Sequence, residues 1–165
     1  MSFRFSEKSE RLRRRIVKPL NFRLYLWRNL PLAACAGLGL RRLDETGCAV
    51  SLPGGWRTQN PFQSTYFAAQ AMAAEMSTGA PAMVLAAGAT ASVALILVEI
   101  RAVFTKRIQG ASLFTFEGVA EMGAAIERAV AGSEPEKYTA RSSGRSADGN
   151  LAAEFEVTWS FKRRG

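Results

Sequence analysis

The sequence predicts an α+β domain in which an antiparallel sheet is organised around one helix of small residues. Residues 60–75 are almost entirely small and apolar, which suits a helix that is buried on most sides. In the closing segment, residues 151–162, apolar and polar side chains alternate strictly, as in a strand with one buried and one wet face. A second amphipathic helix is expected at residues 119–131, inserted between strands.

The composition suits one ordinary globular domain with a real core, since 48% of the 165 residues are hydrophobic and 22% are charged. The formal charge of +8 is concentrated, because nine Lys or Arg fall between Arg4 and Arg28 and the group 162–164 is also basic. Such clusters are typical of a solvated basic helix, a phosphate-bearing ligand or an acidic membrane surface. No nucleic-acid-binding motif accompanies the charge, so we do not expect a nucleic-acid partner.

The chain divides into a basic helical segment, residues 1–29, and a main domain, residues 30–165. Residues 6–29 have a helical pattern that we expect to break near Pro19. One side of this segment is basic, and its expected apolar side consists of Leu12, Ile16, Leu20, Leu24 and Trp27. Its Phe22, Tyr25 and Trp27 would also be available for weak contact with an acidic membrane.

We expect the main domain to consist of strands before and after the small-residue helix. Residues 38–43 and 48–52 form an expected hairpin, and a loop at 53–59 leads to the helix. The following expected strands are 82–87, 92–106 and 111–116, and the helix at 119–131 comes next. The last two strands, 137–146 and 151–162, make a hairpin around Asp148 and Gly149.

The small-residue helix has start and stop signals of its own. Asn60 is a typical N-cap residue and Pro61 suits the first helical position. Ser77, Thr78, Gly79 and Pro81 predict its end. Within it, Ser64 and Glu75 share one stripe, about 16 Å apart along the axis.

Glu75 is the first functional candidate, because it is the one carboxylate of this helix. Acidic side chains are seldom buried unless they are paired or functional, since an unpaired buried charge costs several kcal/mol or shifts the pKa. The alternatives are that Glu75 is solvated or forms an ion pair with Arg57 or Arg101.

The residue types that are missing exclude several chemistries. The chain has no histidine, which rules out Ser-His-Asp and Cys-His mechanisms and histidine-based zinc sites. Cys35 and Cys48 lack metal spacing and suggest reduced, buried small residues, so no metal site is expected. Residues 76–98 carry no charge, but their many small residues argue against a membrane span, and we expect a cytoplasmic protein.

Four stretches carry a resemblance to a known family: AGLGLRRLDETGCAVSLP, NPFQSTYFAAQAMAAEMSTGA, IRAVFTKRIQG and EFEVTWSFKRR. They resemble the hotdog-fold thioesterase superfamily, in particular the branch called domain of unknown function 4442, a relative of the PaaI-type acyl-CoA thioesterases. The resemblance covers roughly residues 30–164. It implies a curved antiparallel sheet wrapped around the central helix, and hydrolysis of an acyl thioester carried by coenzyme A or acyl-carrier protein.

The resemblance also implies roles for individual residues. Asn60 matches an asparagine before the central helix, and Glu75 matches the carboxylate that serves as general base or nucleophile. Ser64 and Tyr66 lie where relatives keep small glycines, so Tyr66 either crowds the thioester or donates its hydroxyl. Backbone N–H groups from Ser64 to Phe67 would hold the oxyanion. The catalytic candidates are therefore Glu75, Asn60 and Ser64, and Tyr66 and Phe67 would contact substrate.

Four basic residues are candidates for the phosphates of coenzyme A: Arg57, Arg101, Lys106 and Arg107. Hotdog relatives pair with their central helices antiparallel, which implies a homodimer or a dimer of dimers in which Glu75 faces the Asn60 end of the partner's helix. No cofactor is implied, because the coenzyme A thioester would be the substrate. The alternative is a non-catalytic hotdog dimer that binds an acyl chain or a protein.

Overall fold

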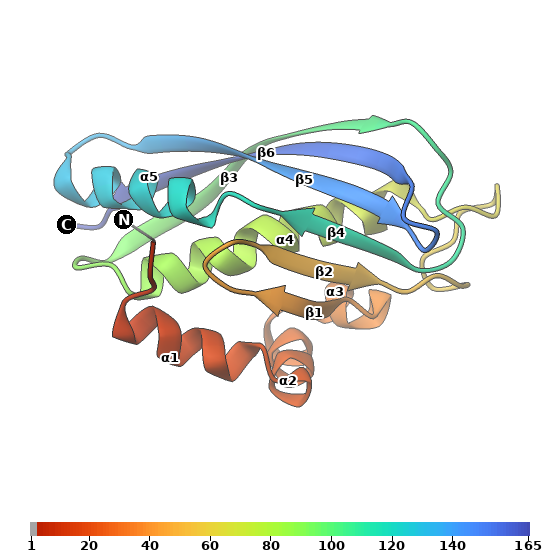
Figure 1. Ribbon diagram of the computed structural model, residues 1–165, viewed down its shortest axis with the longest axis horizontal. Coiled ribbons are helices and arrows are strands. Elements are labelled where there is room, and N and C mark those ends of the chain that lie inside the picture. The colour runs from red at the N-terminus through yellow and green to blue at the C-terminus, as the bar shows by residue number, and fades with distance from the viewer. Residues whose placement is uncertain (1–2) are drawn as a thin grey trace.

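The computed structural model describes residues 3–165 and contains one six-stranded antiparallel sheet and five helices in that range (Figure 1). The strands are β1 (Gly39–Leu43), β2 (Cys48–Leu52), β3 (Val93–Phe104), β4 (Ser112–Phe116), β5 (Glu136–Ser146) and β6 (Leu151–Arg163). The helices are α1 (Glu7–Ile16), α2 (Pro19–Asn29), α3 (Pro31–Ala36), α4 (Phe67–Ala87) and α5 (Val119–Ala131). The strand order is β1-β2-β4-β5-β6-β3, and every neighbouring pair is antiparallel. The predicted α+β architecture is confirmed.

The core lies between α4 and the face of the sheet that curves around it. The sheet contributes large aromatic side chains to this core, among them the buried Phe114, Phe155 and Phe161. The helix contributes small residues such as Ala73 and Ala74, which are also buried. Burying each phenylalanine stabilises the fold by about 1.5–3 kcal/mol. The small helical side chains let α4 approach the sheet closely.

The start predicted for the central helix at Asn60 is wrong, since α4 begins at Phe67 after an extended Tyr66. Asn60 has a local role instead. Its Oδ1 accepts hydrogen bonds from the backbone N–H groups of Phe62 and Ser64, at 3.0 and 3.1 Å. A cap-type residue therefore closes a tight loop seven residues before the helix begins, a use of asparagine that sequence cannot distinguish from capping.

The predicted end of the helix near Pro81 and the predicted strand at 82–87 are also wrong, because α4 continues to Ala87. The hydroxyls of Ser77 and Thr78 donate back to the carbonyls of Ala74 and Glu75 at 2.7 and 2.9 Å, which is compatible with a continuous helix. Pro81 itself is buried with the residues on either side of it. Packing against the sheet therefore overrides the local breaker signals.

The basic N-terminal segment breaks before Pro19 as predicted, and its two helices pack beside the core. Ser9 of α1 is buried and donates a 2.9 Å hydrogen bond to the carbonyl of Val84 in α4. The side of α2 predicted to be apolar is not the buried one, because Phe22 and Leu26 point inward. The other side of α2 exposes Leu20 (69%), Leu24 (60%) and Trp27 (56%). Both sides of α2 are apolar, so its pattern did not identify the buried one.

The short helix α3 was not expected, and it places Cys35 at the surface rather than in the core, whereas Cys48 is buried as predicted. The predicted helix at residues 119–131 and the hairpin around Gly149 are confirmed. Within residues 3–165, no helix is long and apolar enough to cross a membrane. The division of the chain into a helical segment, residues 1–29, and a main domain, residues 30–165, stays a prediction.

Candidate functional site

Glu75 lies on the one stripe of α4 that neither the sheet nor the N-terminal helices cover completely. This partly buried stripe consists of Ala68, Ala71, Met72, Glu75, Gly79, Met83 and Ala86. Within the described chain the Glu75 carboxylate makes no hydrogen bond and no ion pair, and partial burial raises its pKa. Arg101 pairs instead with Glu99, at 2.9 Å. Both pairings considered from the sequence, with Arg57 and with Arg101, are therefore absent from the described residues.

The groups around Glu75 leave little more than the space that its carboxylate needs. Gly79, one turn later, leaves room for the carboxylate, since a Cβ at this position would lie 2.9 Å from Glu75 Oε1 and 3.2 Å from the Trp159 ring. Tyr25 of α2 is close enough for the charge of Glu75 to raise the pKa of its phenol, after the larger effect of burial. A negative charge on Glu75 therefore lies in a partly dehydrated environment. Tyr25 of α2 is near it, and the Trp159 ring approaches the neighbouring Gly79.

The N-terminus of α4 offers unpaired backbone donors. The N–H groups of Ser64, Thr65 and Tyr66 are occupied by Asn60 Oδ1, the Ile108 carbonyl and the Thr58 carbonyl, at 3.1, 2.8 and 2.7 Å. No side chain caps the helix, and the N–H groups of Phe67 and Ala68 have no acceptor within the described residues. Free N–H groups at a helix start attract anions and developing oxyanions.

A cavity of about 500 Å³ opens beside this helix start. It brings together six of the nine predicted site residues, namely Asn60, Ser64, Tyr66, Phe67, Lys106 and Arg107. Asn60 uses its oxygen for the loop and for the Ser64 hydroxyl at 3.1 Å, while its Nδ2 makes no hydrogen bond within residues 3–165. The cavity therefore combines amide, hydroxyl and cationic groups.

Gln70 is a lining residue that the sequence analysis did not select. Its Nε2 donates to the Thr65 carbonyl at 3.0 Å, while its Oε1 is buried without a hydrogen-bond partner in the described chain. The signal available in the sequence was the same as for Glu75: a single polar side chain among alanines.

The remaining predicted residues lie elsewhere. Arg57 lines a second, mostly apolar cavity of about 590 Å³, which shares Tyr66 with the first. Arg101 projects from the outer face of the sheet, because its partner across the β3–β6 ladder, Glu156, is outward-facing and its neighbours Ile100 and Ala102 pair with the buried Val157 and Phe155. It does not reach either cavity.

The two ends of the candidate site are too far apart to act together within one chain. Eight residues of α4 separate Phe67 from Glu75, which corresponds to about 12 Å along the helix axis. The free N–H groups and the carboxylate therefore cannot contact the same substrate atom in one subunit.

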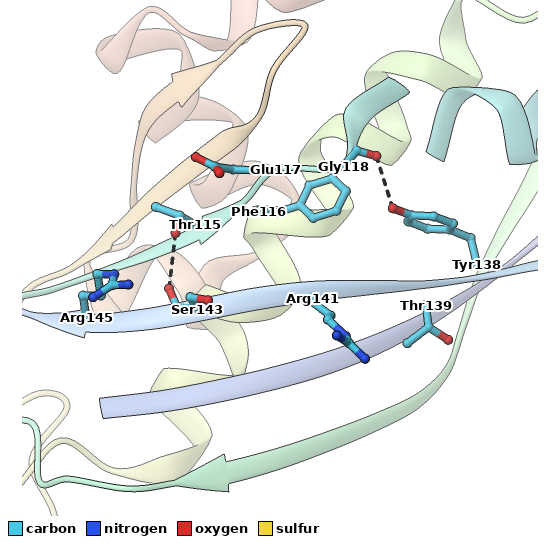
Figure 2. Close-up of a pocket in the computed structure, with 9 residues that line it drawn as sticks. All are labelled: Thr115, Phe116, Glu117, Gly118, Tyr138, Thr139, Arg141, Ser143 and Arg145. Carbon is cyan, nitrogen blue, oxygen red and sulfur yellow. Dashed lines mark hydrogen bonds between the residues drawn. The ribbon is translucent and has the colours of Figure 1, made fainter. Parts of the chain in front are cut away.

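A third hollow, of about 460 Å³, lies beside β4 and β5 (Figure 2). The hydroxyl of Tyr138 donates to the Gly118 carbonyl at 3.3 Å, while Arg141 and Arg145 project from β5. None of the predicted site residues lines it. It contains neither the free helix N-terminus nor the unpaired carboxylate, so it is not our candidate site.

No protein-family model matches the chain, and no curated protein matches it. Several solved structures do. A Pseudomonas aeruginosa protein named as a probable thioesterase has a TM-score of 0.73 and 18% identity, over 88% of this chain and 97% of that one. A thioesterase from Haemophilus influenzae has a TM-score of 0.65 and 13% identity, over 88% and 91% of the two chains.

A thioesterase from Staphylococcus aureus, solved as a variant, has a TM-score of 0.63 and 15% identity, over 80% of this chain and 98% of that one. These neighbours share the overall fold of this chain at low sequence identity. The chain therefore has the hotdog fold.

Proposed function

We propose that this protein is a hotdog-fold thioesterase that hydrolyses an acyl thioester at the interface of a homodimer. The observation that carries the proposal is Glu75, an unpaired carboxylate with a raised pKa on the partly covered stripe of the central helix. A carboxylate in such a setting is a stronger base than a solvated one, as general-base catalysis requires.

The proposed reaction uses groups of this chain and water. The Glu75 carboxylate removes a proton from a water molecule, whose oxygen attacks the thioester carbonyl. The N–H groups of Phe67 and Ala68 in the other subunit stabilise the negative charge that develops on the carbonyl oxygen. Collapse of the intermediate expels the thiolate, which takes up the proton held by Glu75, and releases the carboxylic acid. Direct attack by Glu75 as nucleophile is the alternative route. Neither route needs a cofactor or a metal.

The spacing of two residues supports this assignment. The S. aureus thioesterase was solved with a glutamine replaced by alanine and, separately, with a glutamate fifteen positions later replaced by alanine. In the present chain Asn60 and Glu75 are also fifteen residues apart. We therefore assign Asn60, with its free Nδ2, to binding the thioester or the water, and Ser64 to holding Asn60 through its hydroxyl.

The dimer follows from the 12 Å separation and from an exposed strand edge. β3 is the last strand of the sheet and pairs on one side only. From residue 96 to 104 every residue of it is exposed, including Ile96, Ile100 and Val103. Such a long apolar edge is a template for pairing with a second strand. Two copies joined here would place their central helices antiparallel, with Glu75 of one facing Phe67 of the other, and two such dimers could pair further.

We infer that the leaving group is coenzyme A or an acyl-carrier protein. Lys106 and Arg107 line the cavity at the helix start, where charge-assisted hydrogen bonds would hold the phosphates. Arg57 is placed beside the neighbouring cavity, and Arg101 is assigned a weaker role at the outer face of the interface. The four sequence stretches that resemble domain of unknown function 4442 support placing the chain in that branch.

Steady-state hydrolysis of acyl-CoA esters of graded chain length tests the proposal. We expect turnover by the wild type, a loss of at least a hundredfold in kcat for Glu75→Gln, and activity that falls as the pH drops through the raised pKa of Glu75. Glu127→Gln, at an exposed position of α5, is the matched control. Turnover that is unchanged in Glu75→Gln would remove Glu75 from the mechanism.

The second candidate, a non-catalytic hotdog dimer, is favoured by one observation. Tyr66 lines both cavities and packs edge-on against Phe67 with their ring centroids 4.7 Å apart, so it narrows the approach to the helix start. If no acyl-CoA or acyl-carrier-protein thioester is hydrolysed but native mass spectrometry finds a retained acyl ligand or protein, this candidate replaces the first.

A further inference from the structure

The geometry points to a membrane-docking surface formed by α2, α3 and the loop after β2, and we propose that it binds the anionic face of a lipid bilayer. This docking surface is defined by five exposed apolar side chains and four basic ones: Leu20, Leu24, Trp27, Leu32, Trp56, Lys18, Arg23, Arg28 and Arg57. The inference concerns where the protein works and does not require that it hydrolyses a thioester.

The apolar part of the surface is contiguous. Leu20, Leu24 and Trp27 are spaced by four and three residues, so they lie on one side of α2. Trp27 then lines the same 590 Å³ cavity as Leu32 of α3 and Trp56 of the loop. Leu32 and Trp56 are 71% and 87% exposed. Exposed apolar side chains gathered in this way mark an interaction surface.

The charges around this surface are of one sign. Residues 11–43 and 46–74 contain no aspartate or glutamate. None of the four basic residues of the surface forms an ion pair among residues 3–165, whereas Arg11, Arg13 and Arg14 of α1 all pair with glutamates. Arg23 and Arg57 line an adjoining hollow together with Arg41, and Trp27 belongs to both this hollow and the apolar cavity. The surface therefore offers unneutralised cations beside exposed tryptophans.

This combination fits an anionic bilayer better than it fits a second copy of the chain. Tryptophan and leucine partition into the headgroup and upper acyl region, while arginine and lysine bind anionic lipids. A second copy would bring its own cations against these cations, because the surface carries no acidic residue with which they could pair. The apolar cavity opens on the same side, so its mouth would face lipid.

Co-sedimentation with vesicles tests the proposal. We expect the wild type to bind phosphatidylcholine vesicles that contain phosphatidylglycerol and to bind pure phosphatidylcholine at least tenfold more weakly. Arg23→Glu/Arg57→Glu should weaken binding by at least thirtyfold, since losing two basic residues costs about 25-fold and the two added carboxylates are repelled by the anionic surface. The control Lys137→Glu/Lys162→Glu has the same net charge but changes exposed lysines of β5 and β6, and it should stay within threefold of the wild type.

A dye attached to a cysteine thiol reports which face of the protein contacts the vesicles. Cys35 is exposed and lines the apolar cavity, whereas Cys48 is buried and its burial raises the thiol pKa to about 12. A polarity-sensitive dye will therefore label Cys35 selectively at neutral pH. We expect its emission to shift to the blue on addition of anionic vesicles, and Leu24→Ser/Trp27→Ser to abolish this shift.

Three results would overturn the proposal: equal or no binding to both vesicle types, equal losses in the two charge-reversal variants, or no dye shift on anionic vesicles. A change from dimer to monomer in Leu24→Ser/Trp27→Ser, without vesicle binding by the wild type, would assign the surface to self-association instead.

Discussion

The indole N–H of Trp159 donates a 2.9 Å hydrogen bond to Oγ1 of Thr78, which joins β6 to the turn of α4 that carries Glu75. Thr78 donates in turn to the carbonyl oxygen of Glu75, at 2.9 Å. Trp159 and Thr78 are both buried. The Thr78 hydroxyl therefore links the backbone of Glu75 to β6.

Removing that hydroxyl should destabilise the protein. Thr78→Val keeps the shape of the side chain but leaves the buried indole N–H without an acceptor, which costs about 1–3 kcal/mol in the free energy of unfolding. Urea denaturation measures this cost. Thr139→Val is the control, because Thr139 shares its 2.9 Å hydroxyl contact with Thr158 at the exposed surface of the sheet. Equal losses in the two variants would contradict a structural role for the Thr78 hydroxyl.

The raised pKa of Glu75 makes a prediction about stability that does not depend on activity. A carboxyl group whose pKa is higher in the folded than in the unfolded protein binds its proton more tightly when folded. The protonated carboxyl group therefore contributes favourably to the free energy of unfolding below its unfolded-state pKa. This contribution is lost as the pH rises through the folded-state pKa. Glu75→Gln, which never ionises, should raise the free energy of unfolding relative to the wild type at pH 8 and should lose this advantage at pH 4.

Urea midpoints at the two pH values measure this difference, and Glu127→Gln on the exposed side of α5 provides the reference for an ordinary solvated carboxylate. A gain for Glu75→Gln that is the same at pH 4 and pH 8 would show that burial does not perturb the carboxyl group.

The sequence predicted elements well where side-chain periodicity and burial agree. In β6, Phe155, Val157 and Phe161 alternate with polar residues, and each of the three is buried as expected. In α5 a single apolar side faces the core, and the predicted bounds are those observed. The errors concern α4 and α2, whose patterns are ambiguous, and the short α3, which was not expected. The side chains of α4 are small and apolar on nearly every side. The length predicted for this helix therefore depended on local start and stop signals, which packing overrides.

The candidate site was predictable in its residue types but not in its geometry. Glu75 was identifiable as an isolated acid, and Lys106 and Arg107 do lie near Asn60. The free N–H groups of Phe67 and Ala68 could not be located, because they depend on where the helix begins. The position of Arg101 on the outer face depends on strand register, including the irregularity between Leu97 and Glu99, which no single-sequence pattern reveals.

The edge of β3 should control the oligomeric state. Ile96 and Val103 are 63% and 60% exposed, and each pairs across the sheet with an outward-facing residue of β6. Lysine on an edge strand discourages pairing with another strand. Ile96→Lys/Val103→Lys should therefore shift a dimer to a monomer in size-exclusion chromatography with light scattering. Leu113→Lys, on the interior strand β4, should leave the mass unchanged; a dimer that survives the double substitution places the interface elsewhere.

The N–H of Phe67 should contribute to turnover if it belongs to the oxyanion site. Phe67 is the first residue of α4 and follows an extended Tyr66, so proline fits its backbone while removing the N–H. Phe67→Pro should lower kcat about a hundred- to a thousandfold, as expected for the loss of one oxyanion donor. Phe67→Ala loses the same ring but keeps the donor, and it should retain kcat within about tenfold. If both variants lose kcat equally, the ring and not the N–H is responsible.

Mixing two inactive variants should restore activity if each site is built from both subunits. Glu75→Gln removes the carboxylate from one end of α4, and Phe67→Pro removes the donor from the other end. In a mixed dimer of two-fold symmetry, one of the two sites then carries an intact Glu75 from one subunit and an intact Phe67 N–H from the other. After unfolding and refolding an equimolar mixture, half of the dimers are mixed and have one intact site of two, so about a quarter of the wild-type kcat is expected. Refolding each variant alone is the control and should restore nothing. Activity that stays absent in the mixture, while light scattering shows dimers, would mean that both groups act within one subunit, which the 12 Å of helix between them makes unfavourable.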